Sequence, residues 1–452
     1  MKKIISLIVC ICIAATVFFC GCFDLGGKSG RDGRDGLDGQ DVSIYEIYEA
    51  AKTVPGNENL TLDEFLKKYL SYSQSELSDL VNKQKVINRS LMSSCSILSR
   101  FSYNSSSTRN KVYMGSGVFL WVDKAVGDAY VVTNCHVVYD DSSREVFCDD
   151  VRLYLYGQDV KGINFTYDGY GNIANDDNYA IHARVMAASV TYDIALLRVK
   201  GSEVIKNNEI IAASFCAAED VHVGEFVYAV GNASGEGVSA AEGIISKDSE
   251  YISLNLSDVS STSSKSYRVM RTSAAINHGN SGGGLFNASG ELVAIVNSKD
   301  DESDVDNMGY ALPASNVKRL LKLMYDNYAE NGGFTEGISR PMLNVETTII
   351  DSYAKYDNDT GLAEIYETVQ VSSVNGMPAI KNLKVGDEIR ALKITDSNGT
   401  VKENIKVTRR HHIGDVMLSA RGGDTLTVTV KRGNEEVDVN ILFNSDYNLH
   451  YD

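Results

Sequence analysis

The spacing of hydrophobic residues divides the chain into a helical beginning and a long remainder rich in strands. Between residues 43 and 84, apolar side chains recur at three- and four-residue intervals, which predicts helices. The stretch from Thr61 to Glu64 has the spacing of a capping box, which starts a helix. From about residue 85, short β-branched runs bounded by glycine and polar turns predict strands. We therefore expect a mainly β protein behind an N-terminal helical spacer.

The predicted strands are short and lie between polar segments. They are Ser94 to Leu98, Gly115 to Leu120, Val131 to Val138, Ile194 to Val199, two runs within Asp220 to Ile245, Ile252 to Leu256, Tyr267 to Thr272 and Leu292 to Asn297. A helix with one apolar face is expected from Val317 to Tyr328. The polar stretch Ser102 to Lys111 is interpreted as a loop. Another, Tyr139 to Ala180, is rich in Asp, Asn, Gly and Tyr and is interpreted as a surface insertion.

Ser281 lies in a glycine-rich turn, Gly279 to Gly283, between two apolar segments. A serine becomes an effective nucleophile when it has a base, an orienting carboxylate and donors for the developing oxyanion. Glycines allow the tight turn that directs two backbone N–H groups into one hole. Taken alone, the same residues are equally typical of an ordinary loop.

Two further stretches strengthen the catalytic interpretation. His136 ends a β-branched run and Asp193 precedes another, although each residue by itself has an ordinary structural explanation. Together, the order His136, Asp193, Ser281 resembles that of the chymotrypsin-like serine proteases. The segments similar to the HtrA (DegP-type) branch are Thr133-Asn134-Cys135-His136-Val137, Asp193-Ile194-Ala195-Leu196-Leu197 and Gly279-Asn280-Ser281-Gly282-Gly283. The resemblance covers about residues 85 to 445.

This resemblance implies a chymotrypsin-like double β-barrel over residues 85–330, with Ser281 as nucleophile and His136 as general base. Asp193 would orient the imidazole, and the backbone N–H groups of Gly279 and Ser281 would form the oxyanion hole. No cofactor and no metal site are expected. The substrate would be an unfolded or extended polypeptide.

The resemblance also suggests substrate-binding positions. Ala275, six residues before the serine, would lie at the base of the primary pocket, and an uncharged base favours a small or medium apolar residue. Asn297 ends the strand along which the substrate backbone would pair. His278 and Gly284 occupy positions where the family commonly has proline. The added flexibility beside Ser281 is compatible with a gated resting loop.

Residues 341–445 form a separate predicted unit that resembles a PDZ domain. Its similar segments are Val369 to Val374, Pro378 to Ile380, Leu383 to Ile389 and Gly423 to Arg432. PDZ domains bind peptides by adding a strand to a sheet edge, and Ala363 to Tyr366 is our candidate for the carboxylate-binding loop. The alternative is a small β domain without a peptide groove. The run Arg409 to His412 is interpreted as a solvated loop, because neighbouring residues on a strand face opposite ways and cannot share a metal.

The N-terminus has the features of a secretory signal. A basic start, Met1 to Lys3, precedes the apolar run Ile4 to Phe19, and the segment ends in Phe19-Cys20-Gly21-Cys22. This resembles a bacterial lipoprotein signal over residues 1–21, with Cys22 as the lipidated residue because small Gly21 precedes it. The alternative is an uncleaved membrane anchor. Both interpretations place the remainder outside the cytoplasm and tethered to the membrane.

Residues 22–42 contain glycine at every third position over a short stretch without proline. We interpret this collagen-like stretch as a flexible stalk; trimerisation through it is the less favoured alternative.

Composition narrows the class of partner. The chain has a net charge of −17, which argues against nucleic acid. Among its cysteines, Cys135 adjoins His136 on a strand-like run and should point into the core, and disulfide pairing is left open.

These observations together predict a membrane-tethered, extracytoplasmic serine endopeptidase acting on unfolded or damaged proteins. A peptide-binding or chaperone-like surface lipoprotein with a dormant or gated site is the alternative. A homotrimer is common in the family, and a purely structural adhesin has no positive support.

Overall fold

The computed structural model describes most of the chain beyond residue 73. The described residues are 48–49, 51–53, 57–62, 64–65, 74–101, 111–143, 145–148, 150–158, 179–216, 221–253, 266–299, 308–336, 339–375, 382–444 and 449–451. The predicted signal peptide, Cys22 and the glycine-rich stalk lie outside them, as do residues 102–110 of the expected loop and Pro378 to Ile380. None of the described helices has the length and apolar character needed to cross a membrane.

The chain divides into two compact units, Met1–Leu77 and Ser78–Asp452. In the first unit, Phe65 is buried and packs against neighbouring apolar residues that include Tyr48 and Leu60. The predicted capping box is confirmed, because Thr61 N donates to Glu64 Oε2 at 2.9 Å and Glu64 N donates to Thr61 Oγ1 at 3.3 Å.

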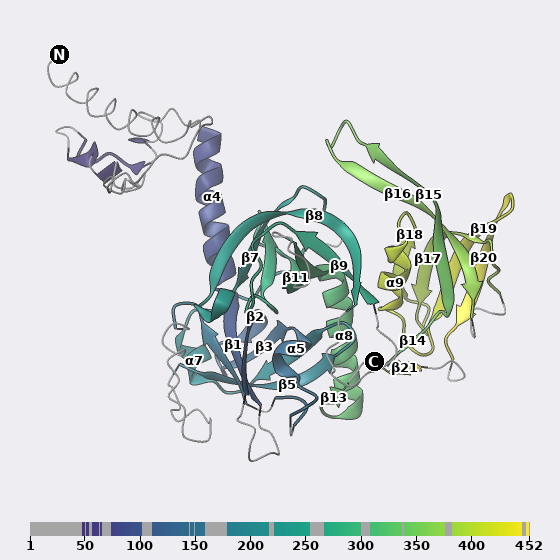
Figure 1. The fold of residues 1–452 in the computed structure, drawn as a ribbon, viewed down its shortest axis with the longest axis horizontal. Coiled ribbons are helices and arrows are strands. Elements are labelled where there is room, and N and C mark those ends of the chain that lie inside the picture. The colour runs from purple at the N-terminus through teal and green to yellow at the C-terminus, as the bar shows by residue number, and fades with distance from the viewer. Residues whose placement is uncertain are drawn as a thin grey trace, which may run out of the picture. The chain divides into compact units, whose positions relative to one another are not determined.

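The second unit begins with the rest of helix α4 (Gln74–Leu91), which continues past the boundary expected at residue 84, and a first β-barrel follows (Figure 1). The strands of this barrel are β1 (Ser94–Phe101), β2 (Lys111–Asp123), β3 (Asp128–Thr133), β4 (Val151–Leu155), β5 (Ile181–Ser189) and β6 (Ile194–Val199). They run in the order β5-β4-β1-β2-β3-β6, and pairing of β5 with β6 closes the ring. The short helix α5 (Cys135–Val138) lies between β3 and β4, and another short helix, α7 (Glu203–Asn207), follows β6.

A second closed barrel has the order β10-β11-β12-β9-β8-β7. Its strands are β7 (Phe226–Gly231), β8 (Ser239–Ser253), β9 (Ser266–Thr272), β10 (Gly284–Asn287), β11 (Leu292–Lys299) and β12 (Gly309–Pro313), with the short 3₁₀ helix η2 (Ala233–Gly235) after β7. Helix α8 (Ala314–Asn331) contacts strands of both barrels (Figure 1). The predicted mainly β, chymotrypsin-like double barrel is therefore confirmed.

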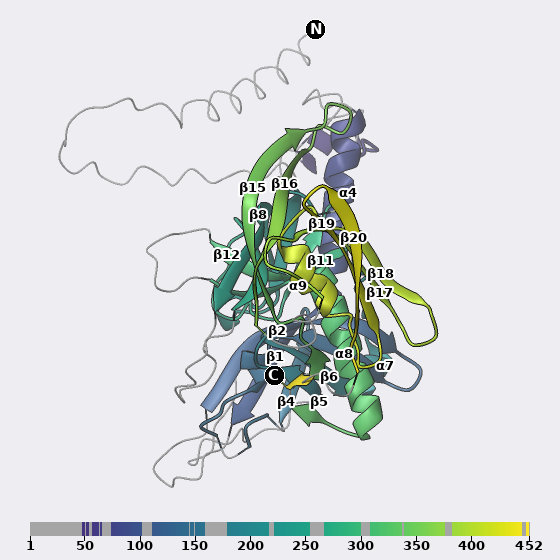
Figure 2. The ribbon, with the colours of Figure 1, turned by 90° about the vertical axis from the view of Figure 1, so that its right-hand side faces the viewer.

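A third sheet follows, with its own buried core around Leu392 and Val428. Its strands are β15 (Val345–Tyr356), β16 (Ala363–Val374), β17 (Glu388–Thr395), β18 (Val401–Lys406), β19 (Thr425–Arg432) and β20 (Glu435–Leu442), with helix α9 (His411–Met417). Strands β15 and β16 continue beyond the others as a two-stranded arm (Figure 1, Figure 2). Before this sheet, β13 (Thr335–Glu336) pairs with β5, and β14 (Ser339–Pro341) pairs with β21 (Leu449–Tyr451).

Four interpretations from the sequence are wrong. The strand expected from Val131 to Val138 ends at Thr133, because Cys135–Val138 forms helix α5. The stretch expected to be a surface insertion contains β4, whose five residues are all buried and complete the first barrel. Ala363 to Tyr366 begins strand β16 and pairs with β15, so this segment is not a loop. The run Arg409 to His412 is not a solvated loop, because α9 starts at His411, which is only 7% exposed.

The correction at α9 has a tertiary cause. Asp415 of this helix hydrogen-bonds to Arg268 and, at 2.9 Å, to Asn316 Nδ2 of the protease-like part. Arg409, just before the helix, bonds to Asp248. The charged run is therefore held against the second barrel, where a solvated loop would have no partner.

Candidate active site

The turn that carries Ser281 requires glycine at two positions. Gly279 has φ +93° and Gly282 has φ +84°. A Cβ atom at Gly279 would lie 2.2 Å from the Asn232 carbonyl oxygen, and one at Gly282 would lie 2.2 Å from the carbonyl oxygen of Ser116. Both the left-handed backbone and the crowding exclude a side chain here. The glycine-rich sequence is thus explained by the geometry of the turn.

Both barrels hold Ser281 in place. Ser116 N, on β2 of the first barrel, donates to the Ser281 carbonyl oxygen at 2.8 Å. Gly282 N donates to Val296 O, on β11 of the second barrel, at 2.9 Å. The side chain of Ser116 also connects the two barrels. Its hydroxyl donates to Gly279 O at 2.6 Å and accepts from Asn232 N at 2.7 Å. Ser281 therefore lies at the junction of the two barrels.

Strand pairing brings His136 and Asp193 together although 57 positions separate them. His136 lies on α5 directly after β3, and Asp193 directly precedes β6, the strand that pairs with β3. Nδ1 of His136 lies 2.7 Å from Oδ2 of Asp193, and the His136 backbone N–H donates to Oδ1 at 2.9 Å. The carboxylate thus holds both the ring and the backbone of the histidine.

Asn297 is also bonded to this carboxylate. Asp193 and Asn297 are both fully buried, and Asn297 Nδ2 donates to Asp193 Oδ2 at 2.8 Å. The Asn297 side chain consequently faces the carboxylate, and the expected pairing of substrate backbone along its strand stays a prediction. The sequence contained no signal for this contact, because it joins residues of the two barrels that lie 104 positions apart.

These surroundings shift two pKa values. Burial alone lowers the pKa of His136, but the charge of Asp193 and the hydrogen bond to it outweigh burial and leave that pKa raised. Burial, with the nearby charge of Asp193, raises the pKa of the Tyr267 hydroxyl well above its usual value. The region behind the imidazole therefore holds the Asp193 carboxyl group and a phenol that is neutral at neutral pH.

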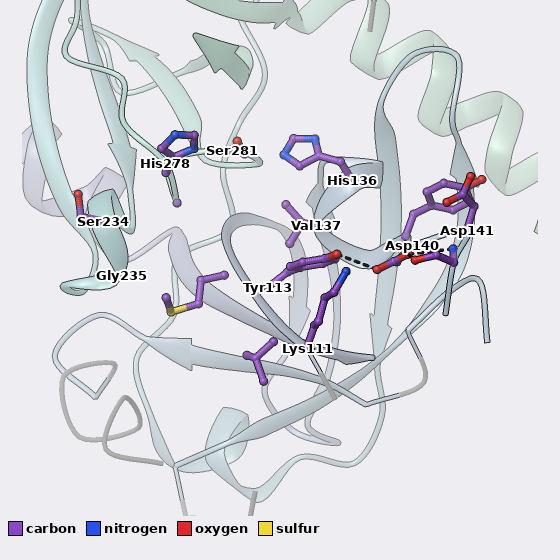
Figure 3. Close-up of a pocket in the computed structure, with 15 residues that line it drawn as sticks. Lys111, Tyr113, His136, Val137, Asp140, Asp141, Ser234, Gly235, His278 and Ser281 are labelled. Carbon is purple, nitrogen blue, oxygen red and sulfur yellow. Dashed lines mark hydrogen bonds between the residues drawn. The ribbon is translucent and has the colours of Figure 1, made fainter. Parts of the chain in front are cut away.

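His136 and Ser281 line one cavity of about 560 Å³ (Figure 3). In this view Ser281 lies between His136 and His278. The remaining lining residues come mainly from the start of β2 and the segment after α5 and include Lys111, Tyr113, Met114, Tyr139, Asp140 and Asp141. Ala275 is exposed and is not among them, so its predicted place in the primary pocket stays a prediction. Among the described residues, no hydrogen bond engages the Ser281 hydroxyl.

The backbone beside Ser281 presents two hydrogen-bond donors. The His278 carbonyl oxygen accepts from Ser234 N at 2.7 Å, and in a trans peptide the next N–H points the opposite way. Within the described part of the chain, the N–H groups of Gly279 and Ser281 donate to no protein acceptor. Both residues line the cavity. These two N–H groups are therefore candidate donors to an oxygen atom bound in the cavity.

The described residues gather no group of three or more metal-ligating side chains. The polar groups of the cavity instead suit proton transfer and anion stabilisation, with an imidazole, a hydroxyl and two N–H donors around one space. This set of groups can perform acyl transfer.

Comparison with known proteins supports this chemistry. The trypsin-like peptidase domain family matches residues 115–295. The chain is 31% identical over 350 residues to the serine protease Do-like HtrA of Lactococcus lactis subsp. cremoris, covering 74% of each chain. It is 27% identical over 380 residues to the serine protease Do-like HtrA of Bacillus subtilis, covering 82% of this chain and 73% of the relative. Among solved structures it is similar to the HtrA-type protease AlgW with a tripeptide, with TM-score 0.48, 20% identity, and coverage of 81% of this chain and 97% of AlgW.

Proposed function

The chain belongs to the HtrA family of serine endopeptidases, and on that basis we propose that Ser281, His136 and Asp193 form its catalytic triad. The observation that carries the proposal is that His136, which is joined to Asp193 at 2.7 Å, lines the same cavity as Ser281, whose hydroxyl makes no hydrogen bond among the described residues. The substrates are unfolded or damaged proteins, whose extended backbone can enter the cleft.

In the proposed reaction, Ser281 Oγ attacks the carbonyl carbon of the scissile peptide bond while His136 accepts the hydroxyl proton. Asp193 accepts a hydrogen bond from the Nδ1–H group of His136, and the negative charge of Asp193 stabilises the imidazolium. His136 then protonates the leaving amine, and the acyl group stays on Ser281 until water, activated by the same imidazole, hydrolyses the ester.

The negative oxygen of each tetrahedral intermediate is bound by the N–H groups of Gly279 and Ser281. Each such donor typically contributes about 3 kcal/mol to the stability of the transition state. Because the Ser234–His278 bond already turns the Gly279 N–H away from Ser234, the hole is preorganised before a substrate arrives.

For the primary pocket, the uncharged residue Ala275 favours a small or medium apolar side chain before the scissile bond.

We assign the third sheet, within residues 341–445, to a PDZ-like domain that binds peptides, and residues 85–330 to the protease domain. In support, β15 lies at the edge of its sheet and, within the described part of the chain, pairs only with β16. An extended peptide can add to such an edge through backbone hydrogen bonds. The carboxylate-binding position is not Ala363 to Tyr366, which is strand.

The proposed location is the extracytoplasmic face of a bacterial membrane. The support is in the sequence: a signal peptide over residues 1–21, a lipidated Cys22, and a glycine-rich stalk over residues 22–42 that leads to the helical spacer at 43–84. A homotrimer is the assembly that the family resemblance favours.

The test is digestion of casein by residues 23–452 beside Ser281→Ala. Ser289→Ala, a change at an exposed turn, is the matched control. Cleavage by wild type and Ser289→Ala, and none by Ser281→Ala, is the expected result. If none of the three cleaves casein while all bind it, the chain is a peptide-binding protein with a dormant site and the proposal is wrong.

A further inference from the structure

Tyr192 and Asp193 end a tight turn between the paired residues Ser189 and Ile194 of strands β5 and β6. Asp193 has φ +49°, a left-handed conformation that is uncommon for a residue with a side chain. Inside the turn, Tyr192 N donates to Ser189 Oγ at 3.2 Å and Asp193 N donates to Val190 O at 3.4 Å. These are long bonds, so a backbone of this kind needs support from its surroundings to persist.

Arg340 supplies such support from 148 positions further along the chain. Its Nη2 donates to the Tyr192 hydroxyl at 2.7 Å, and its guanidinium carbon lies 5.7 Å from the centre of the tyrosine ring. Tyr192 is only 9% exposed, which strengthens both the hydrogen bond and the cation–π contact. On its other side the ring packs edge-on against Tyr267, with ring centres 6.2 Å apart.

The segment around Arg340 is itself held at both ends. Glu336 pairs with Ala188 of β5, a few residues before the Asp193 turn. Arg340 pairs through its backbone with His450 near the end of the chain, and Leu343 is buried in the core of the third sheet. Arg340 thus lies between the first barrel and the third sheet. Its side chain contacts Tyr192, the residue next to the proposed catalytic carboxylate of Asp193.

We propose that Arg340 is a positioning residue, which holds the Tyr192 hydroxyl and so keeps the Asp193 turn in the geometry that His136 requires. The inference rests on the proposed function, since it assigns Arg340 a role in that reaction. It contacts no reacting atom and acts only through Tyr192 and Asp193. When the contact is lost, the turn relaxes and the carboxylate holds the imidazole less well.

The test compares Arg340→Ala, Arg340→Lys, Tyr192→Phe and the double variant Arg340→Ala/Tyr192→Phe, with peptide hydrolysis as readout. Loss of a hydrogen bond to a charged group predicts about a tenfold fall in kcat for Arg340→Ala and Tyr192→Phe, with KM little changed. The double variant should fall no further than the larger single effect, because both changes remove one contact. Arg340→Lys, which keeps a charged donor, should recover part of the activity.

Arg319→Ala is the matched control, since Arg319 Nε donates to Glu403 of the same third sheet at 2.8 Å and does not contact Tyr192. It should keep wild-type kcat. The pH dependence of activity is a further readout, and looser packing alone would not change the pH of its acid limb. Because Asp193 raises the pKa of His136, a less well held carboxylate shifts the acid limb of the profile to lower pH.

A second measurement needs no turnover. In histidine-labelled protein the His136 titration is followed by NMR, with the signal assigned by its loss in His136→Gln. A lower His136 pKa in Arg340→Ala and Tyr192→Phe, and an unchanged one in Arg319→Ala, supports the inference. An unchanged His136 titration in the first two variants overturns it, even if wild type cleaves and Ser281→Ala does not. An inactive wild type would reject the proposed function, and the titration would still decide the role of Arg340.

Discussion

The side-chain amide of Asn297 lies 2.8 Å from Oδ2 of Asp193, the same oxygen that His136 Nδ1 approaches at 2.7 Å. Both Asn297 and Asp193 are fully buried. One carboxylate oxygen therefore has two hydrogen-bond partners, and the asparagine helps to fix the orientation of the carboxylate toward the imidazole.

Asn297→Ala should lower kcat by about 10- to 100-fold. The buried carboxylate would lose one hydrogen-bond donor, which costs about 1 to 3 kcal/mol of stabilisation, and it would no longer be held in one orientation. Peptide hydrolysis and thermal unfolding measure the two effects. The control is Asn316→Ala, another buried asparagine, which bonds to Asp415 far along the chain. Equal losses of activity in the two variants would show that Asn297 contributes only to packing and does not orient the Asp193 carboxylate.

Gly279→Ala should lower kcat by about 10²- to 10³-fold, the usual effect of losing one oxyanion donor. The new methyl group would lie 2.2 Å from Asn232 O at a backbone φ of +93°, so the turn must move and carry its N–H with it. The matched control is Gly290→Ala, which has φ +77° but whose Cβ would meet its nearest atom at 3.6 Å. Comparable kcat values for the two variants would argue against the Gly279 N–H as an oxyanion donor.

The pH dependence of kcat/KM should show an acid limb above the ordinary histidine pKa of about 6.5. Only neutral His136 accepts the serine proton, and Asp193 raises its pKa, so activity falls as pH drops through that raised value. Asp193→Asn removes the cause of the shift. We expect a fall of about 10⁴-fold in kcat, measured with sensitive fluorogenic peptides across pH 5 to 9. Its residual activity should have an acid limb at lower pH than that of wild type, and an unmoved limb would assign the titration to another group.

His411 should make the fold sensitive to acid. Burial lowers its pKa strongly, and the charges of Arg268, His412 and Arg409 lower it further. Below a pH of about 6.5, the unfolded chain takes up a proton at this residue that the folded chain does not, so stability is lost as pH falls. His411→Gln should weaken that pH dependence in urea unfolding between pH 7 and 5. His182→Gln, at a site with a 57% exposed side chain, is the control and should leave it unchanged.

Much of the architecture could be predicted because its signals are local. The β-branched runs that predicted the first and eleventh strands lie within β1 and β11, and the amphipathic pattern from Val317 lies within α8. Turn glycines predicted a tight loop at Ser281, and the positive φ values of Gly279 and Gly282 agree. Strand β4 was missed because its five residues lie within a long polar stretch whose composition outweighed them.

By itself, the sequence predicted a mainly β protein, and its resemblance to a known protease family supplied the double barrel and the three residues proposed to do the chemistry. Strand propensity, periodicity and short motifs could show this much because they are properties of neighbouring residues. Only the tertiary structure decided that Asn297 faces Asp193, that Arg340 holds Tyr192 and that α9 packs on the second barrel. These contacts join residues 99 to 148 positions apart. Their distances follow from barrel closure and from how the third sheet packs, which no local pattern encodes.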